Sequence, residues 1–236
     1  MTVHRDQMAH FHQELEVLEN KVLSMVDEAE QMVEMAVEAV TKSEVELAQQ
    51  VVELDDEIDA TYFEVHQTWT SLMARFQPMG SDLRKMAVLI HLSTTFERMG
   101  DQCVNIAKIA QANAGLPRVD RICEQIREMG DLVRPMIRTA TESWLRQDLD
   151  EARLLPAMDE PVDRLNANMY KEMVAVADHP ELLEWAAKMI LVSRALERVG
   201  DQAVDFGEQT AYLITGVRAG FEGHDLAALG EDGETS

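Results

Sequence analysis

The feature that most constrains the fold is an internal repeat. The segment Glu-Arg-Met-Gly-Asp-Gln-Cys-Val-Asn at 97–105 recurs as Glu-Arg-Val-Gly-Asp-Gln-Ala-Val-Asp at 197–205, with six of nine positions identical. Upstream, residues 25–59 align without gaps on 129–163 with eight identities, where roughly two are expected by chance. The alignment offsets are 100 and 104, so the first copy needs a longer turn, at 76–82. The chain is therefore expected to contain one structural unit twice.

Each copy is expected to be helical throughout. Three breaks, at 78–80, 115–117 and 179–180, contain Pro or Gly, and they separate long periodic stretches. We predict helices at 6–41, 44–75, 82–113, 118–146, 148–177 and 181–217. The aromatic content of 5% and the 15 Met also favour helix packing over sheets. The predicted fold class is all-α, with two tandem three-helix bundles at 1–115 and 116–218 and a disordered, acidic, glycine-rich tail at 219–236.

A buried seam is predicted on the third helix of each copy, from apolar residues at spacings of three and four. Its members are Leu89, Leu92, Phe96, Met99, Cys103, Ile106 and Ala110, then Met189, Val192, Leu196, Val199, Ala203 and Phe206. The seam of the second helix includes an aspartate in both copies, Asp55 and Asp159. Burying an unpaired carboxylate is costly, so each should lie at a bundle end, pair with an Arg or support a cation. Pro156 and Pro161 predict a kink or break in the helix near Asp159.

A polar stripe runs along another side of the third helix. Its members are Glu97, Asp101 and Asn105 in the first copy, and Glu197, Asp201 and Asp205 in the second. We expect the stripes to point away from the core, which argues against the enclosed pocket that an enzyme needs. Acidic residues one turn apart repel each other by about 0.2–0.5 kcal/mol, and Arg98, Arg198 or a bound Fe, Mn, Mg or Zn ion would offset this. A solvated helix face is the alternative that stays open.

Composition and missing motifs exclude several function classes. The chain has 44 acidic and 21 basic residues, a net charge of -23 and no basic cluster, so it should not bind nucleic acid. No apolar run is long enough to insert into a membrane, and Cys103 and Cys123 provide no disulfide framework, which favours the cytoplasm. No His follows a Glu by three residues, as ferritin-like di-iron sites require. We expect Cys103 to be buried and His91 to be an ordinary packing residue at the seam edge.

Three features together resemble the PhoU family of phosphate-uptake regulators. They are the tandem bundles, Glu-Arg-x-Gly-Asp in each third helix, and Gln-Pro-Met-Gly-Ser-Asp-Leu-Arg at 77–84. The resemblance implies a cytoplasmic, non-enzymatic negative regulator of phosphate uptake and phosphate-starvation signalling. It also implies two partners, the ATPase subunit of a phosphate ABC transporter and a phosphate-sensing histidine kinase, which would bring the protein to the inner face of the membrane. A homodimer is expected as well.

The same resemblance implies multinuclear sites for Fe, Zn or Mn in the acidic motifs. Carried over by position, the implied ligands are Glu97, Asp101, Glu197 and Asp201. Weaker candidates match other polar positions of the family: Asp55, Asp59, Asp159, Asp163 and Asn105. Asp205 departs from the family's Asn and adds a negative charge to the second site, so the two sites should differ in metal affinity.

Two other classes of protein remain as alternatives. Spectrin-like structural repeats have a similar period, but they run one continuous helix across each junction, which Gly115-Leu116-Pro117 opposes. A metal-dependent carboxylate enzyme built on a helical bundle would need a pocket with a water-activating metal and a general base. Turnover of phosphoesters with added Mn or Fe would support the enzyme, and inactivity would contradict it.

Overall fold

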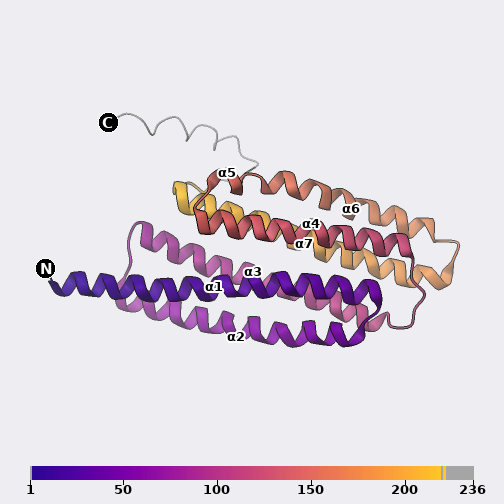
Figure 1. Cartoon of the computed structure of the whole chain (residues 1–236), viewed down its shortest axis with the longest axis horizontal. Coiled ribbons are helices and arrows are strands. Elements are labelled where there is room, and N and C mark those ends of the chain that lie inside the picture. Colours follow the sequence, from indigo (N-terminus) through magenta and orange to yellow (C-terminus); the bar gives the residue numbers. More distant parts are fainter. Residues whose placement is uncertain (1, 219, 222–236) are drawn as a thin grey trace.

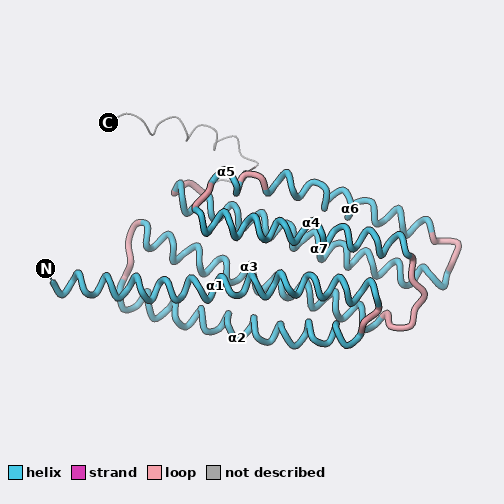
Figure 2. The backbone as a smooth tube through the Cα atoms, viewed as in Figure 1, coloured by secondary structure: helices cyan, strands magenta, loops and turns pink. Residues whose placement is uncertain are grey.

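The computed structural model describes residues 2–218, 220 and 221, which form seven helices and no strand (Figure 2). The helices are α1 (Thr2–Lys42), α2 (Val45–Phe76), α3 (Ser81–Ala112), α4 (Asp120–Arg146), α5 (Leu149–Ala152), α6 (Leu155–Ala175) and α7 (Pro180–Thr215). The all-α prediction is confirmed, and most predicted helix ends lie within a few residues of the observed ones. The predicted acidic tail lies outside the described residues, apart from Gly220 and Phe221.

The predicted helix at 148–177 is divided into α5 and α6. The break lies at Arg153 and Leu154, and Pro156 follows in the first turn of α6, where its missing N–H leaves no helical hydrogen bond unmade. The short α5 is capped by Asp148, whose carboxylate accepts hydrogen bonds from the backbone N–H groups of residues 150 and 151. The break that Pro156 predicted is therefore present, whereas Pro161 lies inside α6.

A residue with a positive φ follows four of the long helices. The φ is 60° at Ser43 after α1, 49° at Gln77 after α2, 53° at Gln147 after α4 and 75° at Gly216 after α7. At Gly216 this conformation directs the N–H back to the carbonyl of Tyr212, at 2.9 Å. The chain consequently reverses direction sharply where α7 ends.

Two bundles lie side by side along their length (Figure 1). The first comprises α1, α2 and α3, and the second comprises α4, α6 and α7 with the short α5 packed against its end. Contacts between the bundles join α1 to α4 and α3 to α7, so α2 and α6 lie at opposite outer edges (Figure 1). The four central helices form a layered interface that the repeat pattern alone did not predict.

One hydrophobic core runs through both bundles. Every residue of the two predicted seams is buried, including Cys103, as expected. At the interface the rings of Phe96 on α3 and Phe206 on α7 meet edge to face, with centroids 5.1 Å apart, and Trp144 lies 6.0 Å from Phe206. The bundles are thus joined by aromatic packing and do not form separate lobes.

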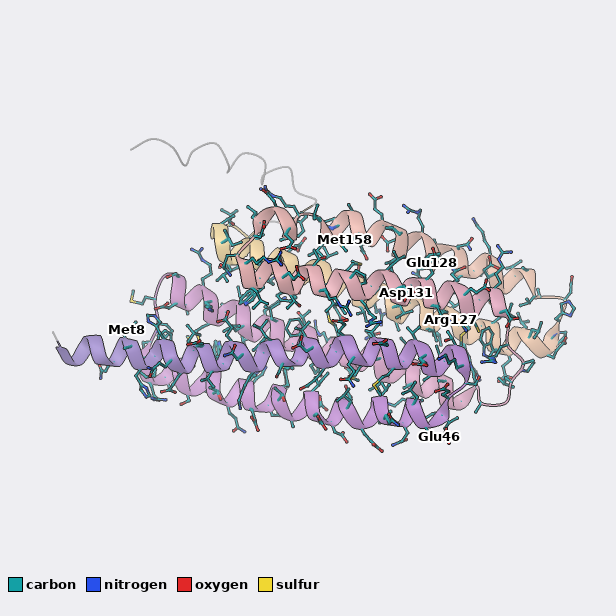
Figure 3. The ribbon with its side chains drawn as sticks, in the orientation of Figure 1. Met8, Glu46, Arg127, Glu128, Asp131 and Met158 are labelled. Atoms are coloured by element: carbon teal, nitrogen blue, oxygen red, sulfur yellow. The ribbon has the colours of Figure 1, made fainter. Side chains whose placement is uncertain are left out.

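Ion pairs join the bundles on the α1/α4 side. Arg138 Nη2 lies 2.5 Å from Glu30 Oε1, and Arg134 Nη2 lies 2.8 Å from Glu34 Oε2. On the same stretch of α4, Arg127 and Asp131 line a groove against α1 (Figure 3). No helix in the described part of the chain is long and apolar enough to cross a membrane.

Candidate functional site

The first group of predicted ligands meets in the groove between α2 and α3. Asp55 and Asp59 of α2 lie close enough to Glu97 and Asp101 of α3 for their charges to interact. Gly100 makes the approach possible, because a Cβ placed there would lie only 2.7 Å from Asp55 Oδ1. The glycine of the repeated motif therefore provides the space into which the α2 carboxylate fits.

The second group repeats this arrangement between α6 and α7. Asp159 and Asp163 of α6 face Glu197 and Asp201 of α7. A Cβ on Gly200 would lie 2.5 Å from Asp159 Oδ1, so the same close approach recurs. Eight of the ten predicted site residues are thus brought into two equivalent clusters, each formed by a seam aspartate, its neighbour one turn later and the acidic pair of the motif.

The clustered carboxylates disfavour each other's ionisation. Burial, followed by the charges of Asp59, Asp101 and Glu97, raises the pKa of Asp55 to about 6. In the second cluster, burial and then the charges of Asp163, Asp201 and Glu197 raise the pKa of Asp159 to about 7. The clusters hold negative charge that is incompletely neutralised at neutral pH, and they would gain from a cation.

Asp159 has the least solvent contact of these carboxylates. Its residue is 8% exposed, and its Oδ1 is buried without a hydrogen-bond partner among the described residues. Neither Asp55 nor Asp159 forms an ion pair with any Arg or Lys in the described part of the chain. Asp55 packs beside Gly100 in the middle of α3, and Asp159 packs beside Gly200 in the middle of α7, so neither aspartate faces a bundle end. Two of the three expectations for a seam aspartate, a place at a bundle end and an Arg partner, are therefore not met in the described part of the chain.

The second cluster opens into a pocket of about 510 Å³. Its lining residues are Pro156, Asp159, Glu160, Asp163, Asp201, Val204, Asp205, Glu208 and Phe221. The motif carboxylates point away from the core, as expected, with Asp201 exposed, and they also border the groove against α6. Sequence reasoning missed Glu160, Glu208 and Phe221. Glu208 could have been found, since it continues the stripe of Asp201 and Asp205 at helical spacing.

The last two predicted site residues, Asn105 and Asp205, lie in different surroundings. Asn105 is exposed on α3. Asp205 instead contacts the other bundle: its Oδ2 lies 2.8 Å from His91 Nε2 and accepts a hydrogen bond from Thr95 Oγ1, at 3.0 Å. Its Oδ1 accepts a bond from Gln209. The description of His91 as an ordinary packing residue was therefore wrong, and Asp205 is largely occupied by the interface.

These contacts hold Asp205 in its charged form. Burial alone would raise its pKa, but the hydrogen bond and charge of His91, with the hydrogen bonds from Gln209 and Thr95, lower the pKa below its ordinary value. We expect His91→Ala to raise the pKa of Asp205 and to lower the free energy of unfolding by about 1–2 kcal/mol. Carboxyl-carbon NMR titration and urea unfolding would measure the two effects. An unchanged Asp205 pKa would contradict this pairing.

Each copy of the repeat matches the same known protein domain. A family model described as the PhoU domain matches twice, at residues 22–110 in the first bundle and 126–210 in the second. The chain belongs to the PhoU family. Among similar PhoU homologues, named as phosphate-specific transport system accessory proteins, that of Clostridium acetobutylicum is 30% identical over 87% of this chain and 94% of its own length. The homologue from Pseudomonas putida is 31% identical over 87% of this chain and 81% of its own.

Solved PhoU structures share the fold. The crystal structure of PhoU from Pseudomonas aeruginosa superimposes with a TM-score of 0.83 at 30% identity, and the match covers 88% of this chain and 100% of that one. PhoU from Streptococcus pneumoniae, at 24% identity, matches with a TM-score of 0.81 over 89% of this chain and 99% of that one. The resemblance read from the motifs is thus confirmed at the level of family and fold.

The carboxylates of the two clusters are chemically suitable metal ligands, but their side chains are not arranged around a common point. Carboxylate oxygens suit hard and borderline cations, and the unpartnered Asp159 oxygen beside Gly200 is a site that a cation would satisfy. Yet among the described residues no three His, Cys, Asp or Glu side chains already have metal-ligand spacing. The carboxylates would have to rotate toward one another around the ion.

Proposed function

We propose that this protein is an accessory regulator of phosphate transport, which represses uptake and phosphate-starvation signalling when phosphate is plentiful. Support comes from the PhoU homologues, which are named as accessory proteins of the phosphate-specific transport system and are matched over 94% and 81% of their own lengths. The protein acts by binding partners in the cytoplasm and carries out no reaction of its own. Its partners are the transporter's ATPase subunit and a sensor histidine kinase, which bring it to the inner face of the membrane.

The two carboxylate clusters are the parts that bind metal. The observation that carries this proposal is the buried, unpartnered oxygen of Asp159 among acidic neighbours, since such a group is stable only with a proton or a cation. Glu97, Asp101, Asp55 and Asp59 would hold one group of Fe, Zn or Mn ions. Their counterparts Glu197, Asp201, Asp159 and Asp163 would hold the other.

The position of the clusters suits docking. In a three-helix bundle the outer groove between two helices faces away from the third, so the α2/α3 groove faces away from α1 and the α6/α7 groove away from α4. Because α1 packs on α4 and α3 on α7, both grooves open on the same side of the molecule. That acidic side, with bound metal, is the surface for a basic partner face. The protein functions as a homodimer whose two copies each present it.

Elemental analysis of the purified protein tests the metal sites. The untagged protein should retain Fe, Zn or Mn, and the double variant Asp101→Ala/Asp201→Ala should lose it without unfolding. The matched control is Asp120→Ala/Asp131→Ala, which removes two exposed acidic side chains elsewhere and should keep the metal. A wild-type protein that stays metal-free after reconstitution would overturn the metal role. If the variant still binds the ATPase subunit as tightly as wild type, the clusters do not form the docking surface.

Activity measurements separate this proposal from the enzyme alternative. The pocket at the second cluster and the raised pKa of its Asp159 are features that a metal-dependent hydrolase would also have. We expect no turnover of phosphomonoesters or phosphodiesters with added Mn or Fe. Turnover that disappears in Asp159→Asn would favour the enzyme.

A further inference from the structure

The pocket at the second cluster is larger than a metal ion needs. Its volume is about 510 Å³, whereas a water molecule occupies about 30 Å³ in the liquid. The pocket does not include the proposed metal ligand Glu197, and it extends along α7 as far as Glu208. Two of its carboxylates, Asp163 and Asp201, are exposed, so it is open to solvent. There is therefore room for an organic group beside the residues that would hold metal.

The lining of this pocket carries negative charge without a matching cation. Among the described residues, six carboxylates line it: Asp159, Glu160, Asp163, Asp201, Asp205 and Glu208. Asp159 is 8% exposed, and its Oδ1 has no hydrogen-bond donor in the described part of the chain. Arg194 and Arg198 of α7 lower the pKa of Asp201 through their charge, against the effect of burial, but neither lines the pocket. The pocket thus presents buried and exposed acceptors, and no basic side chain of the described residues lines it.

The first copy of the repeat lacks this excess of negative charge. In the alignment of the repeats, the positions of the six pocket carboxylates are occupied by four carboxylates, an amide and a lysine: Asp55, Asp56, Asp59, Asp101, Asn105 and Lys108. Lys108 is exposed at the position of Glu208, and Asp55 is only half-buried. The charge that distinguishes the second pocket therefore lies at residues 205 and 208, beyond the four residues that would hold metal.

We propose that the second pocket receives an arginine side chain of the partner protein, whose guanidinium donates hydrogen bonds to Asp159 and its acidic neighbours. The inference rests on the partner-binding function proposed above and names the group that the partner inserts. A guanidinium is always charged and carries five N–H donors in one plane, so it can satisfy a buried acceptor and exposed carboxylates together. Apolar lining residues such as Val204 and Pro156 would contact its aliphatic stem.

Binding of Nα-acetyl-arginine amide to the metal-free protein tests the pocket. In chelator at pH 8, above the Asp159 pKa of about 7, this probe should shift the backbone amide NMR signals of 156–163 and 201–208, and not those of 52–59 and 101–108. Nα-acetyl-citrulline amide has nearly the same shape but no charge, so it should bind about tenfold more weakly. The lysine amide should also bind more weakly, because its ammonium is a point charge without the planar fork. Equal binding of either ligand, or equal shifts in both copies, would overturn the proposal.

Two variants test the residues that carry the inference. Glu208→Lys gives the second copy the lysine that the first copy has at this position, and it should weaken binding of the arginine probe about tenfold. Asp159→Asn should have a similar effect, because it removes the buried charge. The matched control is Glu128→Lys, which makes the same charge change at an exposed position of α4 (Figure 3) and should leave binding unchanged. Circular dichroism checks that each variant is folded. Unchanged probe binding in both pocket variants would contradict the assignment.

Docking of the partner is measured separately. Glu208→Lys should weaken binding of the transporter's ATPase subunit, whereas Glu128→Lys should not. If the wild-type protein binds neither the ATPase subunit nor the kinase, the proposed function fails, and the probe still decides whether the pocket selects a guanidinium. If the pocket takes the probe but Glu208→Lys binds both partners as tightly as wild type, its ligand is not a partner side chain, and the inference is overturned.

Discussion

Phe206→Ala is expected to lower the free energy of unfolding by about 3–5 kcal/mol, the usual cost of removing a fully buried aromatic side chain. Phe206 is 0% exposed and is the point where the bundles meet, because it contacts Phe96 across the interface and Trp144 beside it. Its loss would leave a cavity lined by two other aromatic rings and remove two favourable ring contacts.

Urea unfolding followed by circular dichroism measures this effect. The matched control is Phe63→Ala, which should change the free energy of unfolding by less than about 0.5 kcal/mol because the ring is mostly in solvent. We also expect the wild-type protein to unfold in one transition, since one core runs through both bundles. A loss below about 1 kcal/mol for Phe206→Ala, or two separate wild-type transitions, would mean that the bundles are coupled much less than their packing indicates.

Asp159→Asn is expected to stabilise the metal-free protein at pH 8 by about 2 kcal/mol. The pKa of Asp159 is raised from 3.8 to about 7 in the folded protein, with burial as the main cause. Between these pH values the folded state binds a proton that the unfolded state has lost, so the free energy of unfolding falls as pH rises from about 4 to about 7. At about 1.4 kcal/mol per pKa unit the full effect would be roughly 4 kcal/mol. Water in the pocket and rotation of the carboxylates reduce it.

The amide is neutral at every pH, so the variant should lose this part of the pH dependence. Below about pH 4 the variant and the wild type should be similarly stable, because the wild-type carboxyl is then protonated in both states. Thermal or urea unfolding in chelator, at intervals from pH 4 to 8, measures the difference. Glu160→Gln is the control, since it neutralises an exposed neighbour on the same helix turn. A wild-type protein whose stability is flat over this range would contradict the raised pKa. With metal added, the sign should reverse, because the variant lacks a ligand.

Local periodicity in the sequence was enough to predict most of the helices and their buried faces. The seams of α3 and α7 could be read from spacings of three and four, because a helix places such residues on one side whatever it packs against. The break near Asp159 followed from Pro156 for a similarly local reason. The two acidic clusters could be predicted only in part: the repeat identified their members, but not that the seam aspartates of α2 and α6 meet the motif carboxylates beside Gly100 and Gly200.

By itself, the sequence determined that the chain contains one helical unit twice, which residues of each unit are buried, and which carboxylates recur. These properties depend on neighbours within a few helical turns, and duplication makes them visible. Only the tertiary structure decided that the seam aspartates approach Gly100 and Gly200, and that Asp205 pairs with His91 across the interface. The two aspartate–glycine contacts depend on how helices pack within each bundle, and the His91–Asp205 pair depends on how the two bundles pack side by side, which no local pattern encodes.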